Sequence, residues 1–281
     1  AVYLDFKDAI AKQGKETIAK KYGNLFDMYQ KITGINAYNE PMKISPAAHF
    51  SMGGLWVDYE LSTNIPGLFA IGEANFADHG ANRLGANSLL QACVDGYYIL
   101  PQTLPHYLAQ SGKPDHINSE DPAFVESELV VKKQLEEFGK INGHKTVDFY
   151  HRELGKILYD KCGLSRSEKG LTTAIEAIKN LRNSFYSELK IPKITDGINE
   201  ELEKAGRVAD YLELMCIDAL SREESCGAHF RTEHQTSDGE AIRDDKAFNF
   251  ISCWQQSDHG PVLIKETLDF EFTKPTERSY K

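Results

Sequence analysis

The sequence lacks any segment that would carry it across a membrane. No apolar run approaches the ~20 residues that a spanning helix needs. Residues 1–8 have neither the basic start nor the apolar stretch of a signal peptide. We therefore expect a soluble, globular chain that meets a membrane only through a partner protein. Its 281 residues and 41% apolar content suggest about two domains with a real core.

Cysteine and positive charge are also scarce. The five cysteines are scattered and form no CxxC pair, which argues against a disulfide framework, a zinc site or an iron–sulfur cluster and favours a reducing compartment. The formal net charge is −10, so the clustered positive charge that nucleic acid binding needs is missing. An anionic substrate would need a locally positive pocket, which His49, His79 and Arg83 could supply. Solubility alone also explains an acidic surface.

No glycine-rich nucleotide motif is complete. Gly-x-Gly-x-x-Gly does not occur, so the phosphate-binding half of a dinucleotide fold is missing. Gly80 and Gly85 have the separation of a P-loop. Ala86 and Asn87, however, stand where Lys and Ser or Thr would be required, which excludes a nucleoside triphosphatase.

The densest polar chemistry of the first hundred residues lies between a predicted strand, Leu68–Ile71, and a helix that starts at Asn87 or Ser88. The strand reads as buried, and Glu73 follows it where α/β sheets hold a nucleotide ribose. The loop between strand and helix carries Arg83, and the free amides of a helix start attract anions. A nucleotide and an anion can both be held there.

Periodicity predicts the elements of the first half. Residues 1–46 read as helix plus loop, and short strands are expected at 55–59 and 68–71. A helix with one buried face is expected to run to Pro101, and the breaker-rich residues 112–121 mark a domain boundary. The residues expected on the buried face are Leu89, Leu90, Cys93, Val94, Tyr97 and Tyr98.

The second half is predicted to be helical and then to end in a hairpin. Capping-box spacing at 165–168 precedes an apolar stripe that reaches Leu189, and a second stripe covers 198–219. These helices are expected to pack as a small bundle. Strands at 248–254 and 262–264 would form the hairpin.

Three segments together resemble a known family, the flavoprotein subunits of succinate dehydrogenase and fumarate reductase. HFSMGGLWVD at 49–58 looks like the substrate-histidine segment, GANRLGANSLL at 80–90 like the arginine loop, and SREESCGAH at 221–229 like a third family segment. The resemblance covers essentially all of the chain. The amino acids of the first two segments are similar to those of the bacterial type coupled to menaquinone. It implies an α+β or α/β fold: the C-terminal part of a split FAD-binding α/β domain, a helical bundle and a small C-terminal segment with β structure.

The resemblance also implies roles for particular residues. His49 and Arg83 would bind the dicarboxylate succinate or fumarate. The planar fork of Arg83 can bind a carboxylate with two parallel hydrogen bonds, and the glycine pair at 53–54 lets the backbone approach a bound group closely. The cofactor-binding residues for FAD would be Glu73, which binds the ribose, and Ser88 and Leu89, which contact the flavin through backbone groups.

Plain structural readings compete with these roles. Arg83 can be a surface residue that holds a loop in place, and His49 can be a structural histidine with its hydrogen bonds satisfied. Glu73 can cap a helix or pair with Arg83. His79 is expected to shape the pocket and is left out of the set of site residues. Charged residues in and next to the third segment are expected to dock the C-terminal part onto the flavin domain instead of acting in catalysis; they are Arg222, His229 and Arg231.

By the family pattern, the chain is expected to be the C-terminal portion of a longer flavoprotein. The parts that the pattern implies are the end of a capping domain (1–46), an FAD-binding segment (47–112), a helical bundle domain (113–222) and a C-terminal segment with the hairpin (223–281). The histidine that carries covalent FAD and the catalytic arginine would lie elsewhere. No catalytic residue is expected within this chain, which alone should be inactive.

The resemblance implies partners as well. Electrons would pass to an iron–sulfur subunit and a membrane cytochrome b anchor, with the subunit peripheral on the cytoplasmic face of a bacterial inner membrane. The main alternative is an enzyme similar to L-aspartate oxidase, a soluble flavin oxidase without an iron–sulfur partner; the long tail from Phe248 to Lys281 favours the respiratory subunit. A third possibility is an inactive scaffold or docking fragment.

Overall fold

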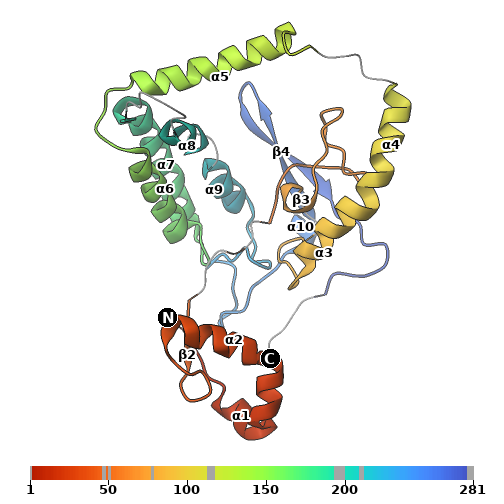
Figure 1. The fold of residues 1–281 in the computed structure, drawn as a ribbon, viewed down its shortest axis with the longest axis vertical. Helices are drawn as coiled ribbons and strands as arrows, with labels where there is room; N and C mark the ends of the chain where they lie inside the picture. The colour runs from red at the N-terminus through yellow and green to blue at the C-terminus, as the bar shows by residue number, and fades with distance from the viewer. Residues whose placement is uncertain are drawn as a thin grey trace. The chain divides into compact units, whose positions relative to one another are not determined.

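The computed structural model describes residues 2–45, 49, 52–76, 79–112, 118–192, 200–208 and 212–276. The chain forms two compact units, Ala1–Ser51 and Met52–Lys281, which are described separately. Figure 1 shows their elements. Among the described helices, none combines the length and the apolar composition that crossing a bilayer demands.

The first unit packs two helices, α1 (Lys7–Gln13) and α2 (Lys15–Thr33), with a two-stranded ribbon. Its strands β1 (Val2–Leu4) and β2 (Met42–Ile44) pair antiparallel. The sequence predicted helix plus loop and missed this ribbon, because three residues are too few to show a period of two. The core consists of Ile18, Phe26, Ala37 and Met42, with the partly buried Phe6, Ala9, Ile10, Tyr29 and Tyr38 against it.

The second unit opens without the predicted strands. At 55–59 and 68–71 only single bridges form, Leu55 with Asn75 and Ser62 with Phe69. Leu68 and Ile71 are 42% and 38% exposed, so the prediction of a buried strand was wrong. A strand needs a hydrogen-bonded neighbour along its length, and the described residues offer only one bridge on each side. A 3₁₀ turn, η1 (Gly72–Ala74), follows.

One helical path runs from Asn87 to Ser111. It comprises α3 (Asn87–Val94), the π-turn η2 (Asp95–Ile99) and α4 (Leu100–Ser111). The start at Asn87 was predicted correctly, but the expected end at Pro101 was wrong. Pro101 lies in the first turn of α4, directly after the wider π-turn, where a missing amide hydrogen is tolerated.

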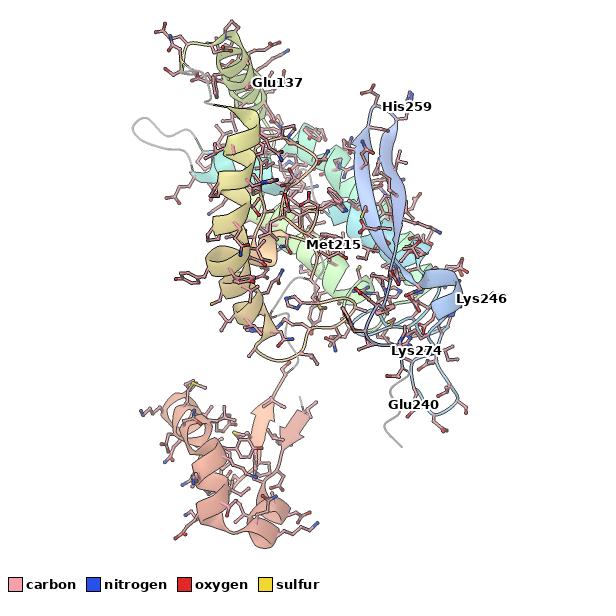
Figure 2. All side chains as sticks on the ribbon, turned by 90° about the vertical axis from the view of Figure 1, so that its right-hand side faces the viewer. Glu137, Met215, Glu240, Lys246, His259 and Lys274 are labelled. Carbon is pink, nitrogen blue, oxygen red and sulfur yellow. The ribbon has the colours of Figure 1, made fainter. Side chains whose placement is uncertain are left out.

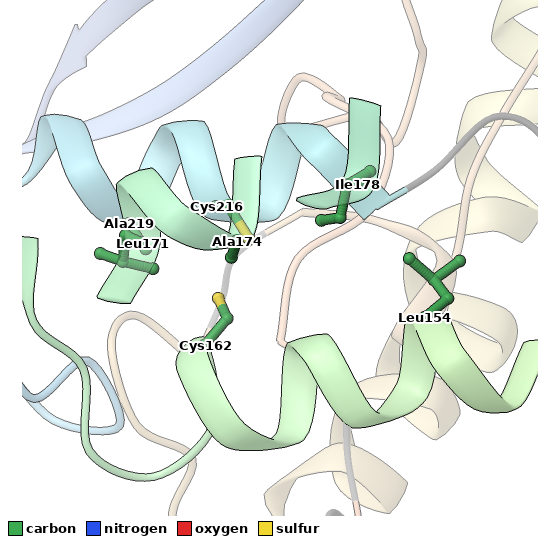
Figure 3. Close-up of a cluster of buried hydrophobic side chains, with 7 residues drawn as sticks. All are labelled: Leu154, Cys162, Leu171, Ala174, Ile178, Cys216 and Ala219. Carbon is green, nitrogen blue, oxygen red and sulfur yellow. The ribbon is translucent and has the colours of Figure 1, made fainter. Parts of the chain in front are cut away.

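The described residues between 118 and 221 contain five helices. They are α5 (Pro122–Lys140), α6 (Val147–Lys161), α7 (Glu168–Glu188), α8 (Glu200–Val208) and α9 (Leu212–Ser221). The helix α7 packs between α6 and α9, and its predicted stripe is confirmed by the buried Leu171, Ile178 and Phe185. Figure 3 shows one of the resulting clusters. The second predicted stripe falls on α8 and α9; its members Ile198 and Ala209 lie outside the described residues.

The start of α7 corrects a detail of the sequence analysis. The N-cap is Ser167, whose side chain accepts a hydrogen bond from the Gly170 amide at 3.0 Å. Ser165, which the capping-box spacing favoured, lies two residues before the helix cap. The spacing alone could not tell the two serines apart.

The C-terminal part of the chain contains a hairpin, as predicted. After a short helix α10 (Asp245–Phe248), the strands β3 (Phe250–Ser257) and β4 (Gly260–Thr267) pair antiparallel along their whole length. In Figure 2, His259 marks the turn between them. Two tryptophans join the hairpin to the rest of the unit. Trp254 Nε1 donates to Asp218 of α9 at 2.8 Å, and Trp56 Nε1 donates to Glu266 of β4 at 2.6 Å.

Candidate functional site

Two buried polar side chains hold the turn that carries Glu73. Asp95, 2% exposed, accepts hydrogen bonds from the Gly72 amide at 2.8 Å and from Asn75 Nδ2 at 3.3 Å. Gln91 Nε2 donates to the Gly72 carbonyl at 3.3 Å and to Asn75 Oδ1 at 2.8 Å. The η1 turn is therefore fixed to α3 and η2 by hydrogen bonds, while Glu73 itself is exposed.

These contacts overturn the expected buried face of α3. The buried side chains are the polar Gln91 and Asp95, because the face that meets η1 must satisfy backbone and amide groups. The apolar residues that the periodicity assigned to the core lie at the surface of the described chain: Leu89 (74% exposed), Leu90, Cys93, Val94, Tyr97 (85% exposed) and Tyr98.

A glycine lets the chain pass closely behind the same turn. A Cβ atom on Gly54 would lie 2.6 Å from the Asn75 carbonyl oxygen, and the Leu55 amide donates to the Ala74 carbonyl at 2.8 Å. The sequence analysis expected the glycine pair to approach a bound group. In the structure Gly54 approaches the chain's own backbone.

The loop that carries Arg83 is tied to the third family segment. The Ala228 amide donates to the Ala81 carbonyl at 2.8 Å. Gly227 has φ +58°, and a Cβ atom there would lie 2.6 Å from the Ala81 carbonyl carbon. The sequence predicted docking through the charged side chains of this region, whereas the contact is made by the backbone of Gly227 and Ala228. Arg83 is half-buried within the loop so anchored.

His229 is locked in one protonation state. Arg166 Nη1 donates to its Nδ1 at 2.8 Å, and its Nε2 donates to the Arg222 carbonyl at 2.9 Å. An arginine cannot accept, so Nδ1 carries no proton and the ring is neutral. Burial, reinforced by the neighbouring guanidinium groups, lowers the pKa of His229 to about 4. His229 thus holds structure and is not placed to exchange protons at neutral pH.

Arg231 caps a helix. Its side chain is buried, and Nη1 donates to the carbonyls of Ala219 at 3.0 Å and Leu220 at 3.3 Å, at the end of α9. A guanidinium at a helix C-terminus satisfies free carbonyls and complements the helix dipole. Arg222 in turn pairs with Glu224 at 2.8 Å. The charged residues of this segment are therefore structural.

The residues expected to bind ligands divide between the two units. Glu73 in η1, Arg83 in the loop, and Ser88 and Leu89 in the first turn of α3 belong to the second unit, where η1 and α3 are in contact. His49 is exposed in the first unit, so its pairing with Arg83 stays a prediction. The analysis missed Asp95, Gln91 and Arg166, whose partners lie too far along the chain for spacing to reveal.

Replacing Gly227 tests the docking contact. Gly227→Ala is expected to lower the free energy of unfolding by about 2–3 kcal/mol, from left-handed strain and overlap with Ala81. Gly239→Ala is the control: Gly239 has φ +84°, but its nearest atom, Gln235 Oε1, lies 3.9 Å away, so about 1 kcal/mol is expected. Urea unfolding followed by circular dichroism gives both values, and equal losses would contradict the contact.

His229 predicts a pH dependence of stability. The unfolded histidine takes up a proton near its ordinary pKa of 6.5, whereas the folded one does so only near 4. Stability is therefore fully present above about pH 6.5 and falls as the pH is lowered towards 4, by on the order of 2 kcal/mol. His229→Gln keeps one acceptor and one donor but does not titrate. Parallel pH profiles for the two proteins would refute the assignment.

Comparison with known proteins identifies the family of the chain. A model described as "FAD binding domain" matches residues 1–89, and one described as "Fumarate reductase flavoprotein C-term" matches residues 151–280. The succinate dehydrogenase flavoprotein subunit of Bacillus subtilis (strain 168) is 32% identical over 99% of this chain and 46% of its own length. An L-aspartate oxidase of Synechocystis is 28% identical over 71% of this chain and 36% of its own.

A solved structure shares the fold. An E. coli quinol fumarate reductase FrdA variant superposes with a TM-score of 0.75 at 26% identity, over 98% of this chain and 45% of that one. The chain thus spans less than half the length of these relatives. With both family models, the relatives and the fold in agreement, the chain belongs to the family of succinate dehydrogenase and fumarate reductase flavoprotein subunits.

Proposed function

We propose that the protein to which this chain belongs interconverts succinate and fumarate with bound FAD. One observation carries the proposal. The second unit gathers the exposed Glu73, the anchored Arg83 loop and the half-buried start of α3 on adjoining elements, with the supporting turn fixed by buried hydrogen bonds. Apart from His49, these are the residues that the family resemblance assigns to cofactor and substrate.

The residues fit an FAD group. Glu73 offers an exposed carboxylate that can accept hydrogen bonds from ribose hydroxyls. Within the described residues, α3 starts without a side-chain cap, so the backbone at Ser88 and Leu89 can meet the flavin. The positive end of the helix favours negative charge there. When bound, FAD supplies the hydride acceptor for succinate and the hydride donor for fumarate.

Arg83 and His49 are proposed to hold the two ends of the dicarboxylate. The guanidinium of Arg83 binds one carboxylate with two parallel hydrogen bonds, and the imidazole of His49 contacts the other. Fixing both charged ends orients the reacting carbon, an effect that supplies several kcal/mol, roughly 7–11 in the best cases. An arginine outside this chain is proposed to move the proton.

The partners follow from the same family. We propose that electrons pass to an iron–sulfur subunit and on to a membrane cytochrome b, with this subunit peripheral on the cytoplasmic face. The name of the E. coli relative, quinol fumarate reductase, supports this order. The menaquinone-linked type stays a prediction. L-aspartate oxidase stays the alternative function, because such an enzyme aligns with 71% of this chain at 28% identity.

An assay of the full-length protein separates these functions. The protein loaded with FAD is expected to oxidise succinate with an artificial electron acceptor and to leave L-aspartate untouched. The 281-residue chain alone is the control, and it should bind no stoichiometric flavin and show no turnover. Oxidation of aspartate without oxidation of succinate would overturn the proposal.

Substitution of Arg83 tests its role within the full-length protein. Arg83→Lys keeps the charge but loses the fork, so kcat/KM for succinate should fall by roughly 100-fold while flavin content is unchanged. Arg152→Lys, at an exposed position of α6, is the matched control and should be neutral. Unchanged kinetics in Arg83→Lys would remove this residue from the substrate site.

A further inference from the structure

Two buried cysteines face each other in the helical bundle. Cys162 ends α6 as its C-cap, and Cys216 lies within α9. Figure 3 shows their sulfur atoms pointing toward one another beside Ala174. The helices α6 and α9 are separated by some fifty residues of sequence, so no local constraint brings the sulfurs together.

The pair is asymmetric in exposure and in charge environment. Cys162 is 5% exposed and Cys216 is 0% exposed, so any reagent reaches Cys162 first. The hydrogen bond from the Cys216 thiol and the positive charge of Arg166 lower the pKa of Cys162 to about 7. The same bond and burial raise the pKa of Cys216. The other charged groups that act on the pair are Asp218 and Glu213, both of α9.

Nothing in the proposed succinate chemistry uses these thiols. They lie in the apolar cluster with Leu154, Leu171 and Ala219, which contains none of the residues assigned to FAD and substrate. Packing alone would be served equally by alanine, which occurs twice elsewhere in the same cluster, or by valine. Cys162 Sγ donates to the Met215 carbonyl, next to Cys216 in sequence, at 3.9 Å, and the two sulfur atoms point toward one another. Two thiols so placed are the arrangement from which a disulfide forms with the least movement.

We propose that Cys162 and Cys216 form a reversible thiol–disulfide site, oxidised by a peroxide. The Cys162 thiolate attacks hydrogen peroxide, which forms a sulfenic acid and releases hydroxide. Cys216 then attacks that sulfur as its thiol proton passes to the departing hydroxyl group, which forms the S–S bond and releases water. The two thiols lose two electrons in total and the peroxide is reduced to two waters. A dithiol reverses the step by exchange.

The cross-link would act on the scaffold behind the Arg83 loop. It would join the end of α6 to α9, whose C-terminus Arg231 caps. Arg166 links the same corner to His229, since its Nε donates to the Cys162 carbonyl at 3.2 Å while Nη1 reaches the ring. The oxidised form would therefore stiffen the support of the segment that docks at Ala81.

The test uses the purified full-length protein, treated with hydrogen peroxide under native conditions. Peptide mapping without reduction should find residues 162 and 216 joined, with full reversal by dithiothreitol. The melting temperature of the oxidised protein should rise by roughly 10 °C, because the bond closes a loop of about fifty residues. Cys93, exposed on α3, measures the oxidation of an ordinary accessible thiol in the same sample.

Two variants fix the order of the steps. In Cys216→Ala, the sulfenic acid of Cys162 cannot be resolved and should be trapped by dimedone. In Cys162→Ala, Cys216 should stay unmodified. Oxidation of Cys93 with no 162–216 bond would overturn the proposal, as would a bond that forms only in urea. Dimedone labelling of Cys216 in preference to Cys162 would also contradict it.

Discussion

The hydrogen bonds that Asp95 makes to the η1 turn are the interaction on which the proposed site depends. They fix Gly72 and Asn75 against α3 and η2, and so they determine where Glu73 stands relative to the helix start. A buried carboxylate with satisfied partners specifies one geometry, whereas an apolar contact would tolerate sliding. Gly54 completes the arrangement by letting the chain behind the turn come within hydrogen-bonding distance.

The second support of the site is also made of backbone contacts. Gly227 and Ala228 meet Ala81 from more than a hundred residues away. Next to them in the sequence, a neutral His229 bridges Arg166 to the Arg222 carbonyl. The Arg231 side chain caps the C-terminus of α9. The bundle and the C-terminal segment therefore stabilise a loop that belongs to the flavin-binding part of the chain.

The sequence predicted well what local pattern controls. The stripe of α7, the start of α3 at Asn87 and the terminal hairpin follow from periodicity and turn residues, and all three are confirmed. The family was found from three short segments. The predicted strands and the buried face of α3 failed for a common reason. A strand needs its neighbours and a helix face its partner, and apolar spacing could not show that the partner of α3 is a polar turn.

The candidate site was predicted residue by residue, but only in part brought together. Glu73, Arg83, Ser88 and Leu89 share one unit, whereas His49 belongs to the other. Asp95 and Gln91 were out of reach of the sequence because nothing in their spacing distinguishes a buried polar anchor from a solvated side chain. Arg166 was hidden for the same reason, since its partner lies 63 residues away.

The wide turn at Asp95–Ile99 sets the rotation of one helix against the next on a shared axis. Gln91, before it, faces the η1 turn, and Thr103, after it, donates to the Glu60 carbonyl at 2.9 Å. Each residue of an α-helical path advances about 100°. Deleting one residue from this turn would rotate Thr103 about the helix axis by that angle. The length of this five-residue segment therefore sets the angle between the helix face that contacts η1 and the helix face that contacts Glu60.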